Sequence, residues 1–337
     1  MKKLLLFFIL LLLSLTSCNN VKTLETSSVL ASSYIVIEQS TNKILEGYNY
    51  NESRSVASIS KIMTAIVTIE NIDINTIVKV PNNINKVYGS SIYLKENQEI
   101  SIEKLLYGLM LRSGNDAAIT LAMSISNSVE EFVLLMNKKA EELNLKNTYF
   151  SNPHGLDEED NGNVSSAYDM ALLYSYCMKN KTFAKITSSQ SYGTYINKNK
   201  LIRTYPYCTG GKTGFTKIAK RTLISSASKD DINLIVVTLN CGNDFQSHKD
   251  IYEHYFNNYK AIRVLNKGEN SFNNVSFYSD DNYYMLCNNN NVILQYRLHI
   301  NYDVIEIYLL DNKGKTIDYL KIDIRKKELW KLLLKCI

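Results

Sequence analysis

The sequence predicts an α/β (α+β) sandwich followed by a small domain built only of strands. An apolar hairpin pattern near the N-terminus and two β-rich runs after residue 220 enclose a long block of segments with helical periodicity. A sheet drawn from both ends of this block, with the helices packed on it, accounts for that order. After about residue 266 only short strand-like runs remain, and these predict the second domain.

The first domain is predicted at 31–262. Residues 33–38 and 43–48 read as two strands joined across a short polar stretch, which is typical of a hairpin. In 58–72, apolar residues recur at helical spacing and predict a helix: Ile59, Ile62, Met63, Ile66 and Ile69. The remaining predicted elements are helices at 102–111, 117–125, 130–143, 167–179 and 248–259, and strands at 221–228 and 232–240.

The second domain is predicted at 266–324. Its expected strands are short runs at 272–277, 283–286, 292–299, 304–310 and 316–324. The stretch 311–315, with Asp, Asn and Gly, is a strong turn signal before the last of them.

Both ends of the chain carry segments that we place outside the folded domains. Lys2 and Lys3 precede an apolar run at 4–13, which has the length of a signal peptide and is short for a membrane span. Small residues before Cys18 resemble a bacterial lipobox, so we predict a signal peptide at 1–17, a lipid on Cys18 and a linker at 18–30. Ordinary cleavage near residue 17 and an uncleaved anchor are the alternatives. Each of them exports the chain, and we expect it at the outer face of the cytoplasmic membrane or, alternatively, secreted.

The C-terminal segment 325–337 is basic and rich in leucine. On a helix, its leucines and Trp330 would share one face while lysines line another, which suits a helix lying on an anionic membrane surface. A terminal helix packed against the strand domain is the alternative.

Composition excludes several classes of function. A formal net charge of +5 is too small and too dispersed to indicate a nucleic-acid partner. The cysteines beyond Cys18 show no CxxC or Cys/His ligand spacing, so we predict no metal site. Cys208 and Cys241 could pair if their strands adjoin, although free buried thiols are the favoured interpretation.

Ser58 and Lys61 form the first motif that carries chemistry. They stand three residues apart at the start of a predicted helix, where i and i+3 side chains lie one above the other. A lysine there can act as base for the serine hydroxyl if burial or neighbouring cations keep its amine neutral. Alone, this spacing is weak evidence, because serine and lysine are common.

Two further motifs follow along the chain. Ser113-Gly114-Asn115 is a polar break between two predicted helices, which could present a hydroxyl and an amide or simply cap a helix. Lys212-Thr213-Gly214 precedes a β-rich run and suits an edge strand along which a substrate backbone can align. The longer spacing of a phosphate-binding loop is absent from this stretch.

The three motifs in this order are more specific than any one of them. The combination SxxK, SxN and KTG resembles penicillin-binding proteins and serine β-lactamases. The chain is similar to the D-alanyl-D-alanine carboxypeptidases among them (peptidase family S11) from about residue 36 to 259. The resemblance includes Gly89-Ser90-Ser91, Asn152-Pro153-His154-Gly155-Leu156 and the stretch 165–171. Residues 209–229 look most like the sporulation-associated branch.

The resemblance implies the serine β-lactamase/penicillin-binding-protein fold and an acyl-enzyme mechanism without metal or organic cofactor. Ser58 would attack the penultimate D-Ala carbonyl of a peptidoglycan stem peptide, Lys61 would take its proton and Ser113 would relay a proton to the departing D-Ala. β-Lactams would acylate the same serine. No obligate protein partner is implied.

The resemblance also implies a binding surface. Asn115 would orient the substrate amide, and Lys212 and Thr213 would face the terminal carboxylate. Gly214 would allow close approach, and the backbone N–H groups of Ser58 and Phe215 would hold the oxyanion. Many relatives place an arginine after this region, and the nearest counterpart here is His248, in reach of the carboxylate or merely a surface histidine. His154 is expected to hold its loop.

Three other functions compete with this interpretation. A class A-like β-lactamase would need a glutamate that activates water, and Glu159 with Asn163 has a suitable spacing. A catalytically inactive cell-wall-binding module would not need the complete motif set. Endopeptidase action on cross-links shares the same site, and the sequence does not separate it from carboxypeptidase action.

Overall fold

The computed structural model describes residues 29–157, 162–272, 275–279, 281–288, 292–299 and 304–323. The predicted signal peptide with Cys18, the tail at 325–337 and Glu159 lie outside these residues.

An antiparallel sheet forms the centre of the first domain, in the order β2-β1-β11-β10-β9. The bounds of its strands are β1 Ala31–Glu38, β2 Lys43–Tyr48, β9 Cys208–Thr216, β10 Lys220–Lys229 and β11 Ile232–Cys241. The predicted N-terminal hairpin is thus confirmed, and β1 pairs with β11 so that Ile35 lies opposite Val237. The strand that carries Lys212-Thr213-Gly214 is β9, at the edge of the sheet.

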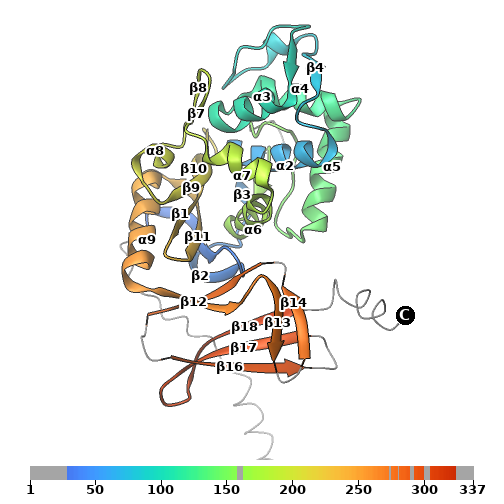
Figure 1. Ribbon diagram of the computed structural model, residues 1–337. Coiled ribbons are helices and arrows are strands. Elements are labelled where there is room, and N and C mark those ends of the chain that lie inside the picture. Colours follow the sequence, from blue (N-terminus) through green and yellow to red (C-terminus); the bar gives the residue numbers. More distant parts are fainter. Residues whose placement is uncertain are drawn as a thin grey trace, which may run out of the picture.

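Helices cover both faces of this sheet (Figure 1). On one face lie η1 Ala57–Ser60, α2 Lys61–Asn71, α3 Ile102–Tyr107, η3 Gly108–Arg112, α4 Asn115–Ile125, α5 Val129–Glu142, α6 Ala167–Met178 and α7 Lys181–Ser188. On the other face lie α8 Leu201–Thr204 and α9 Asp244–Asn258. The side chains of each strand alternate between the two cores: Ile235 and Val237 face the large helical block, whereas Leu234 and Val236 face α9.

The predicted helical block is confirmed, with differences at its ends. The helix expected at 58–72 begins as a 3-10 turn, and α9 begins before residue 248. The remaining short elements of this domain are η2 Ile84–Lys86 and the strand pairs β3 Arg54–Ser55 with β6 Val164–Ser165, β4 Ile77–Lys79 with β5 Glu99–Ser101, and β7 Ser191–Tyr192 with β8 Tyr195–Ile196. Cys241 is buried and Cys208 half-buried, and both are free thiols.

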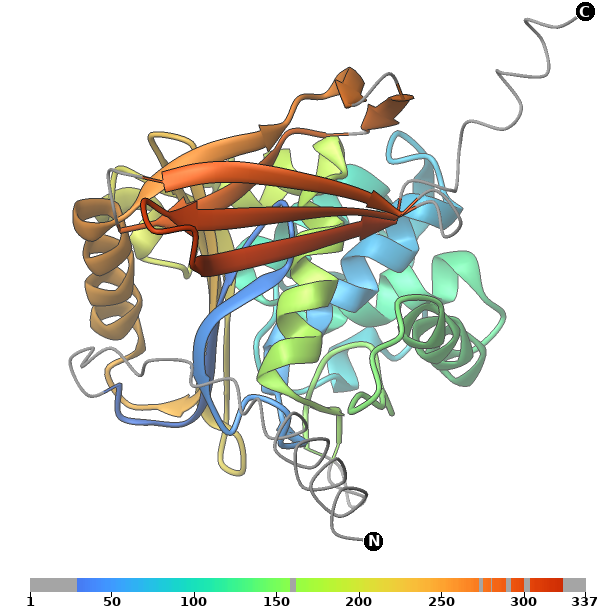
Figure 2. The same ribbon diagram turned by 90° about the horizontal axis from the view of Figure 1, so that it is seen from below.

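The second domain consists of antiparallel strands around a separate apolar core (Figure 2). Its pairs and sheet are β12 Lys260–Leu265 with β15 Tyr283–Cys287, β13 Gly268–Phe272 with β14 Val275–Ser279, and β16 Val292–His299, β17 Val304–Asp311 and β18 Thr316–Asp323. The strand predicted at 272–277 was wrong, because Phe272 ends β13 and Val275 begins β14, and these two residues lie opposite each other in the pair. The predicted end of the first domain at residue 262 falls inside β12, which pairs with β15 and belongs to the second domain.

The β1–β2 turn connects the two domains. Glu38 is 1% exposed, and its carboxylate accepts hydrogen bonds from the backbone N–H and hydroxyl groups of both Ser40 and Thr41. Ser40 Oγ in turn accepts from the backbone N–H of Tyr284 in β15, at 3.3 Å. Lys43, just after the turn, forms an ion pair with Asp318 of β18. The buried carboxylate therefore holds the turn in the shape that receives the strand domain.

Within the described ranges, no single helix is long and apolar enough to cross a membrane. Helices α4 and α5 meet that test only as a pair, bent by 88°.

Replacing Glu38 with alanine should lower the free energy of unfolding by about 1–3 kcal/mol, because it leaves polar groups of the turn without their acceptor. Urea denaturation measures this loss. Glu38→Ala should also speed proteolytic cleavage near residue 260, whereas Glu99→Ala, at an exposed strand glutamate, should change neither property. Equal stability of the two variants would contradict this role of Glu38.

Candidate active site

The structure brings the three sequence motifs together around two lysines. Lys61 Nζ lies 3.0 Å from Ser58 Oγ and 2.8 Å from Asn115 Oδ1. Lys212 Nζ lies 2.9 Å from Ser113 Oγ. Residues from η1, α2, the start of α4 and the edge strand β9 therefore form one polar cluster, although they are far apart in the sequence.

The nucleophile candidate stands on a strained turn. Ala57, directly before Ser58, has a positive φ of 50°, a region that residues other than glycine seldom adopt. Its carbonyl accepts a hydrogen bond from Ser60 Oγ at 2.8 Å, which fixes the turn that starts the helix. Gly155 packs against the same carbonyl so closely that a Cβ would clash with the backbone. Ser58 itself is half-buried, while Lys61 below it is fully buried.

The loop at 152–156 supplies a third acceptor to Lys61. The carbonyl of His154 accepts from Lys61 Nζ and, at 3.4 Å, from Ser58 Oγ. Asn152 shapes this loop, because its Oδ1 accepts from the backbone N–H groups of His154 and Gly155. Asn163 fastens the loop in turn, through its Oδ1 and the backbone N–H of Asn152. The expected loop-holding role of His154 thus involves its carbonyl as well as its ring, whose Nδ1 accepts from Leu156 N at 3.2 Å.

Burial and like charges act on both lysines. Desolvation, the neighbouring Lys212 and Lys198 all hold the pKa of Lys61 well below its usual range, and Asp116 opposes them. Burial, with a contribution from Lys198, lowers the pKa of Lys212 to about 7. Burial and the charge of Lys61 lower the pKa of His154 to about 3. A neutral Lys61 amine keeps a lone pair that can accept the proton of Ser58, as a general base must.

The loop of the second motif is held in a left-handed turn. Ser113 ends η3 with φ 64°, and this turn directs its hydroxyl to Lys212. Asn115 opens α4, and its Nδ2 donates to the carbonyl of Tyr88 at 2.8 Å. Asp116 holds the neighbouring segment, because its carboxylate accepts from Ser91 Oγ and from the backbone N–H groups of Ile92 and Leu94.

The edge strand β9 passes close to the nucleophile. A Cβ on Gly214 would lie 3.0 Å from the backbone nitrogen of Ser58, so only glycine allows this approach. The backbone N–H groups of Ser58 and of Phe215, the next residue on β9, are therefore near each other. The Phe215 side chain is 65% exposed, and Thr213 is half-buried.

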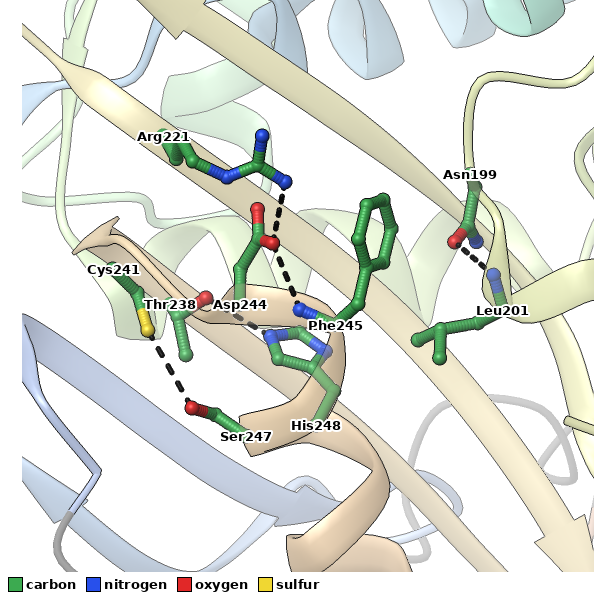
Figure 3. A network of polar contacts seen from close by, with 9 residues as sticks. All are labelled: Asn199, Leu201, Arg221, Thr238, Cys241, Asp244, Phe245, Ser247 and His248. Carbon is green, nitrogen blue, oxygen red and sulfur yellow. Dashed lines mark hydrogen bonds and ion pairs between the residues drawn. The ribbon is translucent and has the colours of Figure 1, made fainter. Parts of the chain in front are cut away.

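The prediction that His248 contacts a substrate carboxylate was wrong, and so was its alternative as a surface residue. His248 is fully buried between α9 and the sheet (Figure 3). Its Nδ1 shares a hydrogen bond with Ser225 Oγ at 2.7 Å and its Nε2 with Thr238 Oγ1 at 3.0 Å. The histidine lies on the face of the sheet away from Lys61, because its helix packs on the opposite core.

The cation on that face near the end of β9 is Arg221. It lies opposite Phe215 in the β9–β10 register, and its guanidinium lies 2.6 Å from Asp244 Oδ1 and over the ring of Phe245 (Figure 3). In the sequence, Arg221 is marked only as the start of a predicted strand. The acidic residue Asp244, four positions before the helix predicted at 248–259, was the sequence signal for an ion pair with Arg221.

The β-lactamase alternative finds no support at Asn163. This side chain is 1% exposed, and its amide is used in holding the backbone of residues 151 and 152. Its proposed companion Glu159 lies outside the described residues.

Comparison with known proteins gives one consistent family. Residues 20–243 match the Peptidase S11 family, described as D-alanyl-D-alanine carboxypeptidase. The D-alanyl-D-alanine carboxypeptidase DacF of Bacillus subtilis is 40% identical over 226 residues, which cover 61% of this chain and 56% of that protein. DacB2 of Mycobacterium tuberculosis is 30% identical, and the match covers 62% of this chain and 74% of the relative.

Solved structures extend the likeness into the strand domain. Penicillin-binding protein 5 of Haemophilus influenzae superimposes with a TM-score of 0.76 at 25% identity, covering 88% of this chain and 97% of that one. Penicillin-binding protein 6B of Escherichia coli gives a TM-score of 0.72 at 28% identity, with coverages of 88% and 96%. The predicted fold class, including the small C-terminal β domain, is thereby confirmed.

Acid should destabilise the protein through His248. Burial lowers the pKa of this histidine to about 3 in the folded state, whereas the unfolded chain binds the proton near pH 6.5. Stability is therefore lost as the pH falls below about 6.5, by about 3 kcal/mol at pH 4. Urea titrations at pH 7 and pH 4 measure the loss.

Substitution isolates this contribution from those of other groups. His248→Gln should lower stability at pH 7 but reduce the further loss between pH 7 and pH 4. Asn257→Gln, at an exposed residue of the same helix that does not titrate, should keep the wild-type pH dependence. A His248→Gln variant with the wild-type slope would refute the assignment.

Proposed function

Because the chain belongs to the D-alanyl-D-alanine carboxypeptidase family of serine peptidases (S11), we propose that it removes the terminal D-Ala from peptidoglycan stem peptides. The reaction passes through an acyl-enzyme on Ser58. The observation that carries the proposal is the buried Lys61 amine, 3.0 Å from the hydroxyl of a half-buried serine at the start of a helix.

Acylation transfers the peptide to Ser58. Lys61 takes the hydroxyl proton as Ser58 Oγ forms a bond to the carbonyl carbon of the penultimate D-Ala. The tetrahedral intermediate collapses when the C–N bond to the terminal D-Ala breaks, and the departing amine takes up a proton. Ser113, hydrogen-bonded to Lys212, stands in the position to relay that proton. The product is an ester between Ser58 and the shortened peptide, together with free D-Ala.

In deacylation, water is the nucleophile and the Ser58 oxygen is the leaving group. Water loses a proton to the same base and forms a C–O bond to the ester carbonyl, and the Ser58 oxygen recovers a proton as its bond to carbon breaks. The backbone N–H groups of Ser58 and Phe215 stabilise the oxyanion in both steps, since β9 brings them together at Gly214. A stem peptide without the terminal D-Ala no longer carries that leaving group, which limits cross-linking.

Substrate recognition rests on the edge strand and on the second motif. An extended peptide adds to β9 through backbone hydrogen bonds, which an edge strand offers. Lys212 and Thr213 face its terminal carboxylate, and Asn115 orients the amide next to the scissile bond. A β-lactam that imitates the terminal dipeptide acylates Ser58 in the same way. The complete set of polar groups, with its short contacts, argues against an inactive cell-wall-binding module.

We place this reaction at the outer face of the cytoplasmic membrane. The basic and apolar N-terminal run, and the small residues before Cys18, support export and lipid attachment.

In a bacterial host, Cys18→Ala should abolish incorporation of labelled fatty acid, while the soluble domain keeps its D-Ala release. Absence of label in the wild-type protein would exclude the lipid anchor.

Ser58→Ala should abolish both fluorescent-penicillin labelling and D-Ala release, because the nucleophile is gone. Ser53→Ala, at an exposed serine, should behave as wild type. Mass spectrometry of stem peptides incubated with the protein measures loss of one D-Ala and cleavage of cross-links together. Labelling of the Ser58→Ala variant at the wild-type level would refute the nucleophile.

Lys61→Arg should lower the rate of acylation by at least about a hundredfold, since a guanidinium keeps its proton at working pH. Lys86→Arg, at an exposed lysine, is the matched control. Stopped-flow acylation with a fluorescent penicillin measures the rate. Turnover near the wild-type level would show that another group accepts the serine proton.

A further inference from the structure

Lys198 is a cation near the site that the mechanism above does not use. It follows β8, in a segment where an exposed lysine stands between two buried asparagines. Asn197 Nδ2 donates to the carbonyls of Thr187 and Ser189 at the end of α7. Asn199 Nδ2 donates to the carbonyl of Gly210 in β9. The backbone at Lys198 is thus tied on both sides.

The neighbouring helix adds to this anchoring. Asn199 Oδ1 accepts from the backbone N–H of Leu201, the first residue of α8, at 3.1 Å (Figure 3). Arg203 of the same helix donates to the carbonyl of Asn197 at 2.7 Å. These contacts hold the backbone of Lys198 in place, so its side chain starts from a defined position, unlike that of a residue in an unsupported surface loop.

Lys198 connects two segments that enclose the Ser113-Gly114-Asn115 loop. Its backbone N–H donates to the carbonyl of Leu111 in η3 at 3.0 Å. Its Nζ donates to Ser90 Oγ at 2.8 Å, and the carbonyl of Ser90 accepts from the backbone N–H of Asn115 at 2.7 Å. One residue therefore joins the segment that ends at Ser113 to the loop that lies against Asn115.

The charges around Lys61 come from several elements. Lys212 on β9 and Lys198 both oppose a proton on Lys61, and His154 stays neutral beside it. Asp116 on α4 favours that proton, but its carboxylate is already used by the backbone and side chain of residues 91–94. Lys198 itself faces Arg112, which adds to the positive field. The balance in the site is positive.

We propose that Lys198 is a positioning residue of the acyl-transfer site. Its ammonium ties Ser90 to the segment that ends at Ser113, and its positive charge opposes a second ammonium at Lys61. This inference rests on the proposed function, because it assigns Lys198 a purpose only if Lys61 must be neutral to activate Ser58.

The two parts of the role predict different changes in the pH profile. Without the charge of Lys198, Lys61 binds its proton more tightly, so the acidic limb of acylation moves to higher pH by about one pH unit. On the acidic limb the rate at a given pH falls about tenfold, and it recovers toward the plateau at alkaline pH. Loss of the Ser90 contact alone lowers the plateau without moving the limb.

The experiment measures the second-order rate of acylation by a fluorescent penicillin from pH 5 to pH 10 on the full chain. Lys198→Met should move the limb, Lys198→Arg should restore its position, and Lys200→Met, at an exposed lysine two residues on, should match wild type. Ser90→Ala keeps the charge and should lower only the plateau. If Lys198→Met fails to fold, Ser90→Ala still tests the contact between Lys198 and Ser90.

The pH profiles test the charge of Lys198 and its contact with Ser90 separately. A Lys198→Met profile equal to wild type, or a uniform loss at every pH that Lys198→Arg does not rescue, overturns the role of the charge. A Ser90→Ala plateau at the wild-type level overturns the tie. Failure of the wild-type protein to form a penicillin adduct would instead reject the proposed function, independently of Lys198.

Discussion

The burial of one ammonium group, that of Lys61, is the constraint on which the rest of the site depends. A lysine without water around it must find hydrogen-bond partners or give up its proton. Here its Nζ contacts Ser58, Asn115 and the carbonyl of His154, which belong to separate parts of the chain. The like charge of Lys212 works with burial in the same direction. Burial makes the charged form of Lys61 unfavourable, and the chemistry needs this same amine neutral.

The architecture provides that burial by closing a helical block over a sheet edge. The 3-10 turn η1, which leads into α2, lies against β9, where the absence of a side chain at Gly214 lets strand and turn approach. The left-handed backbone of Ala57 and the close packing of Gly155 fix the serine turn from the other side. These strained or crowded positions surround Ser58 itself, which agrees with the general concentration of strain at functional sites.

The far face of the sheet supports the site without entering it. His248, held by Ser225 and Thr238, pins α9 to β10 and β11, and β10 carries the edge strand. Because Ser225 lies opposite Gly211 in the register, this polar network stands directly behind the residue that precedes Lys212. A buried polar contact on the face of the sheet opposite Lys61 therefore supports the strand that carries the edge strand.

The sequence by itself determined the local elements, the order of the motifs and the pair Ser58 and Lys61, because helical periodicity and i, i+3 spacing are local properties of the chain. Only the tertiary structure decided which distant groups surround that pair. The carbonyl of His154 is invisible in a motif, since every residue has one, and Lys198 has no neighbour in the sequence that marks it. The side of the sheet taken by His248 was decided by the packing of α9, whose apolar stripe is buried against the second core. A single chain shows which residues can do chemistry, but the distances between them depend on contacts formed only when the whole domain has folded.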